Sequence, residues 1–165
     1  MTTPRWLGEE EQRVWRLYLS VSRKLPDAIA RQTQEEGMSG AYYIIMALLS
    51  EAPGRQLRMS ELADVVSSSP SRISHAVDRL GERGWVRRER SATDRRGNLA
   101  VLTDQGLGVV QRAAPRHVDA VREYLFDLVD RDQLAVLDAV FSAVNERLDA
   151  RAAKARTAGG AEPPG

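Results

Sequence analysis

The chain has 165 residues, of which 42% are hydrophobic and 28% charged, with a net charge of +1, so we expect a globular protein of one domain, or of one compact domain with an extension. It has no cysteine and only two histidines, far apart, which argues against disulfides, thiol chemistry and zinc; we predict no metal and no cofactor. The longest apolar run, Ala41 to Leu49, is shorter than the roughly 20 residues that cross a bilayer, and no secretory signal precedes it, so we predict a cytoplasmic protein without membrane association.

The first predicted elements are two helices. Apolar residues at three- and four-residue steps predict a long helix from Glu9 to about Glu35, ended by Gly37. Ser39 is the expected cap of a second helix over residues 40–50. Because this helix is apolar nearly all round, we place it at the centre of the core.

Two short helices and a turn are predicted next. Ser60 is a plausible cap for a helix ending near Val66, and Ser67 and Ser68 then form a turn. Ser69 caps the following helix, which has Pro70 at its first position and ends at Gly84. Its buried stripe is predicted to be Ile73, Val77 and Leu80.

A hairpin and two more helices complete the chain. We predict strands at 85–89 and 98–102, joined by a polar tip at 90–97. Thr103 or Asp104 caps a long helix that Pro115 must kink or interrupt. Asp130 or Asp132 begins the last helix, and residues 157–165 are expected to be a disordered tail.

The order of a short helix, a tight turn, a capped helix and a hairpin is that of a winged helix-turn-helix. The predicted fold class is therefore mainly α with a small β wing, the winged helix-turn-helix lobe being carried on an all-helical domain, which the family resemblance given below implies to be a dimerisation domain. In this motif the second helix enters a major groove about 12 Å wide, and the wing reaches an adjacent minor groove.

The charge distribution supports this interpretation. Residues 54–98 hold ten arginines against six acidic residues, whereas the rest of the chain has a slight acidic excess. Such a segment is expected to meet a polyanion, and we predict double-stranded DNA as the partner. The alternative explanation is a genome rich in G and C, which would also favour arginine codons. The residues predicted to contact DNA are Ser69, Ser71, Arg72, Ser74, His75, Arg79, Arg90, Asp94, Arg95 and Arg96.

The stretch from Met59 to Arg88, followed by the wing sequence Asp94-Arg-Arg-Gly and then Leu102-Thr-Asp-Gln-Gly106, resembles the MarR family of transcriptional regulators over roughly residues 6–150. The resemblance implies a homodimer that binds a pseudo-palindromic operator, commonly as a repressor released by a small phenolic or anionic ligand. It also implies that Arg95 or Arg96 enters the minor groove, with Asp94 holding the wing by pairing with an arginine.

An effector pocket is the second site that we consider. The candidate residues are Trp15, Tyr18, Tyr42, Tyr43, Met46 and His117. The alternative interpretation assigns these residues to the core or to an interface between subunits. No nucleophile elbow and no glycine-rich phosphate loop is present, so we predict no catalytic residues and no enzyme activity.

The sequence thus predicts a homodimeric DNA-binding repressor. Residues 6–37 and 104–151 are expected to form the helical dimerisation region, and 39–103 the winged lobe. Two alternatives remain open: a regulator or architectural protein that binds DNA without an effector, and a degenerate winged helix used only for protein–protein contact.

Overall fold

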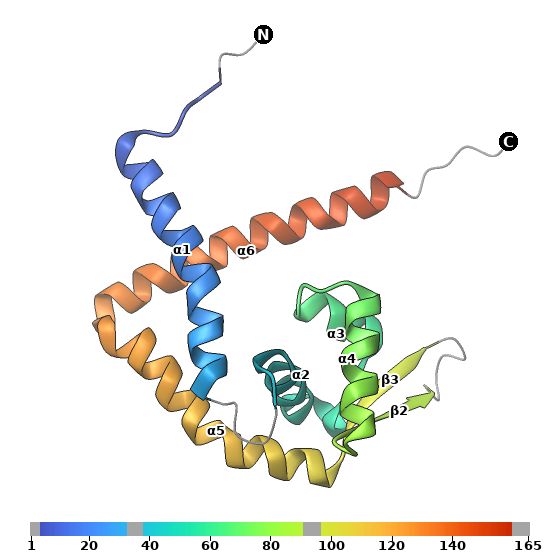
Figure 1. The fold of residues 1–165 in the computed structure, drawn as a ribbon. Helices are drawn as coiled ribbons and strands as arrows, with labels where there is room; N and C mark the ends of the chain where they lie inside the picture. Colours follow the sequence, from blue (N-terminus) through green and yellow to red (C-terminus); the bar gives the residue numbers. More distant parts are fainter. Residues whose placement is uncertain (1–3, 33–37, 91–96, 160–165) are drawn as a thin grey trace, which may run out of the picture. The chain divides into compact units, whose positions relative to one another are not determined.

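The computed structural model describes residues 4–32, 38–90 and 97–159, with side chains up to residue 154. The chain divides into two compact units, Met1–Val121 and Arg122–Gly165. Helices predominate, and the strands belong to the first unit (Figure 1). Within the described ranges, no helix has both the length and the hydropathy needed to cross a membrane.

The first unit begins with helices α1 (Glu9–Gln32) and α2 (Gly40–Glu51). α1 has no buried residue, and its predicted end near Gly37 lies outside the described residues. α2 begins as predicted: the Ser39 hydroxyl accepts a hydrogen bond from the Tyr42 amide at 3.3 Å. This cap fixes the start of the helix that supplies the centre of the core.

The helix-turn-helix consists of α3 (Met59–Val65) and α4 (Pro70–Glu82), preceded by the 3₁₀ turn η1 (Pro53–Arg55) and the strand β1 (Gln56–Arg58). The prediction that Ser60 caps α3 is wrong. The cap position is Arg58, two residues earlier, and the Glu61 carboxylate accepts a hydrogen bond from the Arg58 amide at 3.1 Å. The glutamate therefore satisfies the free amide at this helix start.

The predicted serine turn between α3 and α4 is confirmed. Ser67 adopts the left-handed conformation, with φ of 50°. The amide of Ser67 donates to the carbonyl of Asp64 at 3.0 Å, and that of Ser68 donates to Ala63 at 2.9 Å. These bonds end α3 and direct the chain into the Ser69 cap of α4.

The wing consists of β2 (Val86–Arg90) and β3 (Asn98–Leu102), which pair antiparallel with Val86 opposite Leu102 and Arg90 opposite Asn98. β1 pairs with the other edge of β3, so the sheet has three strands in the order β1-β3-β2. The third strand was not predicted. Three residues show no readable alternation, and their strand conformation depends on a partner more than 40 residues later.

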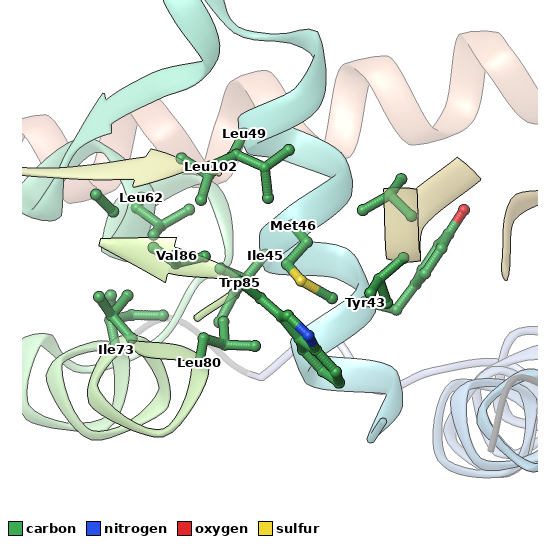
Figure 2. Close-up of a cluster of buried hydrophobic side chains, with 14 of the residues drawn as sticks. Tyr43, Ile45, Met46, Leu49, Leu62, Ile73, Leu80, Trp85, Val86 and Leu102 are labelled. Atoms are coloured by element: carbon green, nitrogen blue, oxygen red, sulfur yellow. The ribbon is translucent and has the colours of Figure 1, made fainter. Parts of the chain in front are cut away.

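The core of the winged lobe lies between α2, the two helices of the motif and the inner face of the sheet (Figure 2). α2 contributes Ile45, Met46 and Leu49, which are at most 2% exposed. The predicted stripe of α4, Ile73, Val77 and Leu80, packs in the same cluster. The side chains drawn in Figure 2 meet from helices and strands alike, so the motif has a hydrophobic core of its own.

α5 (Asp104–Tyr124) continues through Pro115 and bends along its course (Figure 1). Of the two predicted outcomes, a kink or an interruption at the proline, the helix shows a bend and no interruption.

The second unit holds the 3₁₀ turn η2 (Phe126–Leu128) and helix α6 (Arg131–Gly159). Asp130 caps α6 as predicted: its carboxylate accepts from the Gln133 amide at 2.8 Å, and the Gln133 side chain accepts from the Asp130 amide at 2.9 Å. Residues 157–159, predicted to belong to a disordered tail, are helical. Residues 160–165 lie outside the described part of the chain.

Candidate nucleic-acid interface

The N-terminus of α4 presents a group of small polar side chains to solvent. The Ser69 hydroxyl accepts from the Arg72 amide at 3.4 Å and lies 3.3 Å from the Ser71 hydroxyl. Ser71, Arg72 and His75 are exposed on the following turns. Because a helix N-terminus carries unpaired amides and a partial positive charge, this end of α4 suits a phosphate group.

Ser74, also predicted to contact DNA, faces a different environment. It is half-buried, and its hydroxyl accepts a hydrogen bond from the guanidinium of Arg88 on β2 at 2.7 Å. The same Arg88 nitrogen lies 2.9 Å from the Ser74 carbonyl oxygen and 3.0 Å from the Asp78 carboxylate. Arg88 thus joins the first strand of the wing to the middle of α4.

Arg88 was not among the predicted site residues. Strand alternation was the available signal, because it places Arg88 on the same face of β2 as Val86, whose side chain is 1% exposed in the core. The residues on the opposite face, Arg87 and Glu89, form their own ion pair at 2.5 Å.

Most described arginines of the basic segment contact a group within that segment or beside it. The contacts are Arg55 with Asp104, Arg58 with Glu61, Arg79 with Glu82, Arg87 with Glu89, Arg88 with Asp78, and Arg83 over the ring of Trp85. The five ion pairs are exposed and contribute little to stability, about 0–1 kcal/mol each. Their consequence is electrostatic, because each carboxylate cancels much of its arginine's field.

Two arginines differ from the rest. The side chains of Arg72 on α4 and Arg90 at the end of β2 are exposed and form no ion pair or hydrogen bond within the described residues. Asp94, Arg95 and Arg96, at the predicted tip of the wing, lie outside those residues. Within the basic segment of residues 54–98, the described positive charge that remains available to a ligand therefore lies on the N-terminal half of α4 and on the wing.

The candidate effector residues fall into two groups. Met46 is fully buried, and Tyr43 is 6% exposed and packs against His117 of α5 with ring centroids 4.3 Å apart. Burial raises the pKa of the Tyr43 hydroxyl, with a smaller contribution from Glu51, and burial lowers the pKa of His117. Tyr42 is half-buried at the edge of the same core.

The second group lies on α1. Trp15 and Tyr18 stack on each other with centroids 5.4 Å apart, and they are 50% and 52% exposed. The assignment of either group to an effector remains a prediction. Over residues 4–32, 38–90 and 97–159, no cluster of three or more histidine, aspartate or glutamate side chains is arranged to hold a metal ion.

Comparisons with known proteins agree with this geometry. Residues 36–97 match the family model described as MarR family. Two crystal structures from Streptomyces coelicolor are similar over most of their length. Sco3205, a MarR family transcriptional regulator in complex with DNA, is 47% identical, with a TM-score of 0.84 over 88% of this chain and 92% of that one. AbsC, also a MarR family regulator, is 39% identical, with a TM-score of 0.84 over 89% and 99% of the two chains.

A more distant relative is the transcriptional repressor MprA of Escherichia coli, 24% identical over 72% of this chain and 69% of that protein. These proteins are regulators of transcription rather than enzymes, which agrees with the function class predicted from the sequence. The resemblance stated on the wing and helix-turn-helix residues is confirmed, because the identity to Sco3205 extends over nearly the whole length of both chains. The chain belongs to the MarR family of transcriptional regulators.

Proposed function

We propose that this regulator binds double-stranded DNA through α4 and the wing, at a pseudo-palindromic operator. One observation carries the proposal: within the basic segment of residues 54–98, most described arginines contact a neighbouring group, whereas Arg72 and Arg90 are exposed and form no ion pair with a described residue. The DNA complex of Sco3205 supports it. In this proposal Arg72 reads a base edge, and the serines at the start of α4 bind phosphates.

The proposal includes a homodimer. α1 exposes Val14, Leu17 and Val21 at helical spacing, each at least half exposed, and α6 does the same with Val140, Phe141, Val144 and Leu148. Apolar faces of this length on a single chain mark protein–protein contact surfaces. A second copy would cover them and set two copies of α4 roughly 34 Å apart, one turn of DNA.

We further propose that the protein represses transcription and is released from its operator by a small aromatic or anionic molecule. The similarity to MprA, a transcriptional repressor, supports the proposal of repression. The stacked rings of Trp15 and Tyr18 on α1, each about half exposed, offer a surface for such a ligand, since ring-stacking suits an aromatic molecule. A thermal-shift screen against aromatic acids, followed by release of bound operator, tests the effector; a regulator without an effector shows neither response.

The DNA-binding proposal is tested with two variants of equal charge change. Arg90→Ala removes an unpaired guanidinium, so affinity for duplex DNA from upstream of the protein's own gene should fall five- to tenfold, and the salt slope should decrease by about 0.9. Arg87→Ala removes a guanidinium paired with Glu89 and should weaken binding less than threefold. Fluorescence anisotropy at several salt concentrations measures both. Equal losses, or no binding by the unmodified protein, contradict the proposal.

A further inference from the structure

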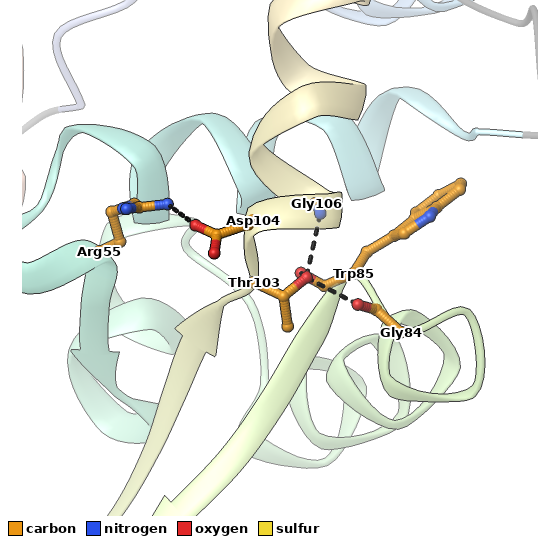
Figure 3. A network of polar contacts seen from close by, with 6 residues as sticks. All are labelled: Arg55, Gly84, Trp85, Thr103, Asp104 and Gly106. Atoms are coloured by element: carbon orange, nitrogen blue, oxygen red, sulfur yellow. Dashed lines mark hydrogen bonds and ion pairs between the residues drawn. The ribbon is translucent and has the colours of Figure 1, made fainter.

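The root of the wing and the first turn of α5 meet at one residue, Thr103 (Figure 3). Its amide donates to the carbonyl of Trp85 at 3.0 Å. Its hydroxyl lies 2.7 Å from the Gly84 carbonyl oxygen and 3.1 Å from that of Trp85, and it accepts from the Gly106 amide at 3.0 Å. A hydroxyl has one proton, and the shorter distance assigns that proton to Gly84.

Gly106 shows how closely the two elements approach. A Cβ atom at this position would lie 2.1 Å from the Trp85 carbonyl oxygen, far inside van der Waals contact, so any other residue would force the backbones apart. Gly84, on the other side of the joint, adopts φ of +72°, which glycine tolerates best. The two glycines allow the start of α5 to rest directly on the chain that leads from α4 into β2.

A second contact at the same place is weaker. Arg55 and Asp104 form an ion pair at 2.8 Å, but the aspartate side chain is 96% exposed. Exposed pairs of this kind contribute about 0–1 kcal/mol and are screened by salt. The Thr103 bonds, by contrast, involve backbone groups of a half-buried joint, so they hold the geometry under the salt conditions in which DNA binding is measured.

Because this joint lies at the root of the wing, it affects the angle of the whole wing. The wing strands extend from Val86 and Leu102 at the root to Arg90 and Asn98 at the far end, about 13 Å at 3.3 Å per residue. A tilt of about 10° at the root would therefore move Arg90 by about 2 Å, enough to break a hydrogen bond to phosphate.

We infer that Thr103 is a positioning residue for DNA binding: at the root of the wing its hydroxyl adds to the contacts of Arg88 with α4 and ties the wing to α5 as well, so that the helix and the wing engage DNA together. The inference rests on the proposed function. It also gives a physical reason for the Thr-Asp-Gln-Gly spacing at 103–106, since the threonine supplies the cap and the wing contact while the glycine supplies the room.

The test compares three variants of the full chain, each measured well below its melting temperature. Thr103→Val keeps the shape and removes the hydroxyl, so duplex affinity should fall about tenfold, and the salt slope should decrease by about 0.9 for each phosphate that the wing no longer binds. Thr103→Ser restores the hydroxyl and should bind within twofold of the unmodified protein. Val109→Ala removes buried volume from α5 one turn beyond Gly106 and leaves the Thr103 hydroxyl in place, so it should lower the melting temperature without changing affinity or slope.

A fourth variant covers the case in which Thr103→Val does not fold. Thr103→Asp keeps an acceptor for the Gly106 amide but has no proton for Gly84, and Gln105→Glu controls for its charge. The aspartate variant should fold and bind at least fivefold more weakly than the control. The inference is overturned, while the proposed function stands, if Thr103→Val binds DNA with the same affinity and salt slope as Thr103→Ser. The same holds if Thr103→Asp matches Gln105→Glu in both quantities. Failure of the unmodified protein to bind any duplex overturns the proposed function itself.

Discussion

The winged lobe and the long helices α1 and α6 bury their apolar side chains to very different extents. In the lobe, Met46, Leu49, Leu62 and Leu80 are fully buried. In α1 no residue is buried, and Leu148 of α6 is 60% exposed. The apolar residues of α4, α1 and α6 all recur at three- and four-residue steps, so the period alone does not tell whether the partner of an apolar face lies within the chain.

The difference teaches where the stability of each part comes from. The lobe has a closed core of its own, so its free energy of unfolding depends on contacts within one chain. In the proposed homodimer, the exposed faces of α1 and α6 gain their burial from a second copy, so their stabilisation would depend on protein concentration. The same protein should respond to mutations in these two regions through different observables.

The largest effect is expected from Phe141→Asp on α6. The ring is 55% exposed in the single chain, so the change should cost a monomer little. Buried at a dimer interface, an unpaired carboxylate is strongly unfavourable. We expect a monomer by sedimentation equilibrium and at least a 100-fold loss of duplex affinity, because two half-sites no longer bind as one unit. Ser142→Asp, with the same charge on the adjacent residue, should stay dimeric; a dimeric Phe141→Asp protein would remove the proposed interface from this face.

A pair of leucine truncations sharpens the contrast. Leu62→Ala in the lobe core should lower the free energy of unfolding by about 2–5 kcal/mol and leave the dimer dissociation constant unchanged. Leu17→Ala on α1, where the side chain is 59% exposed, should instead weaken dimerisation with little effect on the lobe. Denaturant unfolding and sedimentation give the two quantities. If both variants lowered the free energy of unfolding by similar amounts and neither changed the dimer dissociation constant, the two regions would not differ in the source of their stability.

The smallest effect is expected from pH. Burial lowers the pKa of His117, so the unfolded chain binds a proton more readily than the folded one. The stability that the neutral imidazole contributes is present above the ordinary histidine pKa of about 6.5 and is lost as the pH falls towards the folded value. The melting temperature should therefore decrease on acidification, and less so for His117→Phe, which keeps a ring beside Tyr43. Parallel pH profiles for the two proteins would assign the effect to other groups.

The parts of the fold that could be predicted from the sequence are those that depend on neighbouring residues. Ser39 and Ser69 cap their helices because a cap acts within three residues, and the buried stripe of α4 follows from a period of 3.6. The family resemblance was equally accessible, since the wing motif and the glycine that follows it are contiguous in the chain.

The parts that could not be predicted depend on contacts between distant segments. β1 is a strand only because β3 lies beside it, and Arg88 contacts Ser74 fourteen residues earlier. Whether an arginine is paired or available to DNA is likewise decided by three-dimensional neighbours. The sequence therefore indicated a basic segment but did not separate Arg79 and Arg88, which are paired, from Arg72 and Arg90.

The pairing of arginines with acidic side chains also affects how this family member can change over evolutionary time. Glu82 and Glu89 each restrain a positive charge close to the wing or to α4. Replacing either glutamate by an uncharged residue would leave its arginine without an ionic partner. One substitution would then raise the electrostatic attraction of the protein to any DNA duplex, whether or not it contains the operator. Selection for discrimination between operators then acts as much on these glutamates as on the arginines themselves.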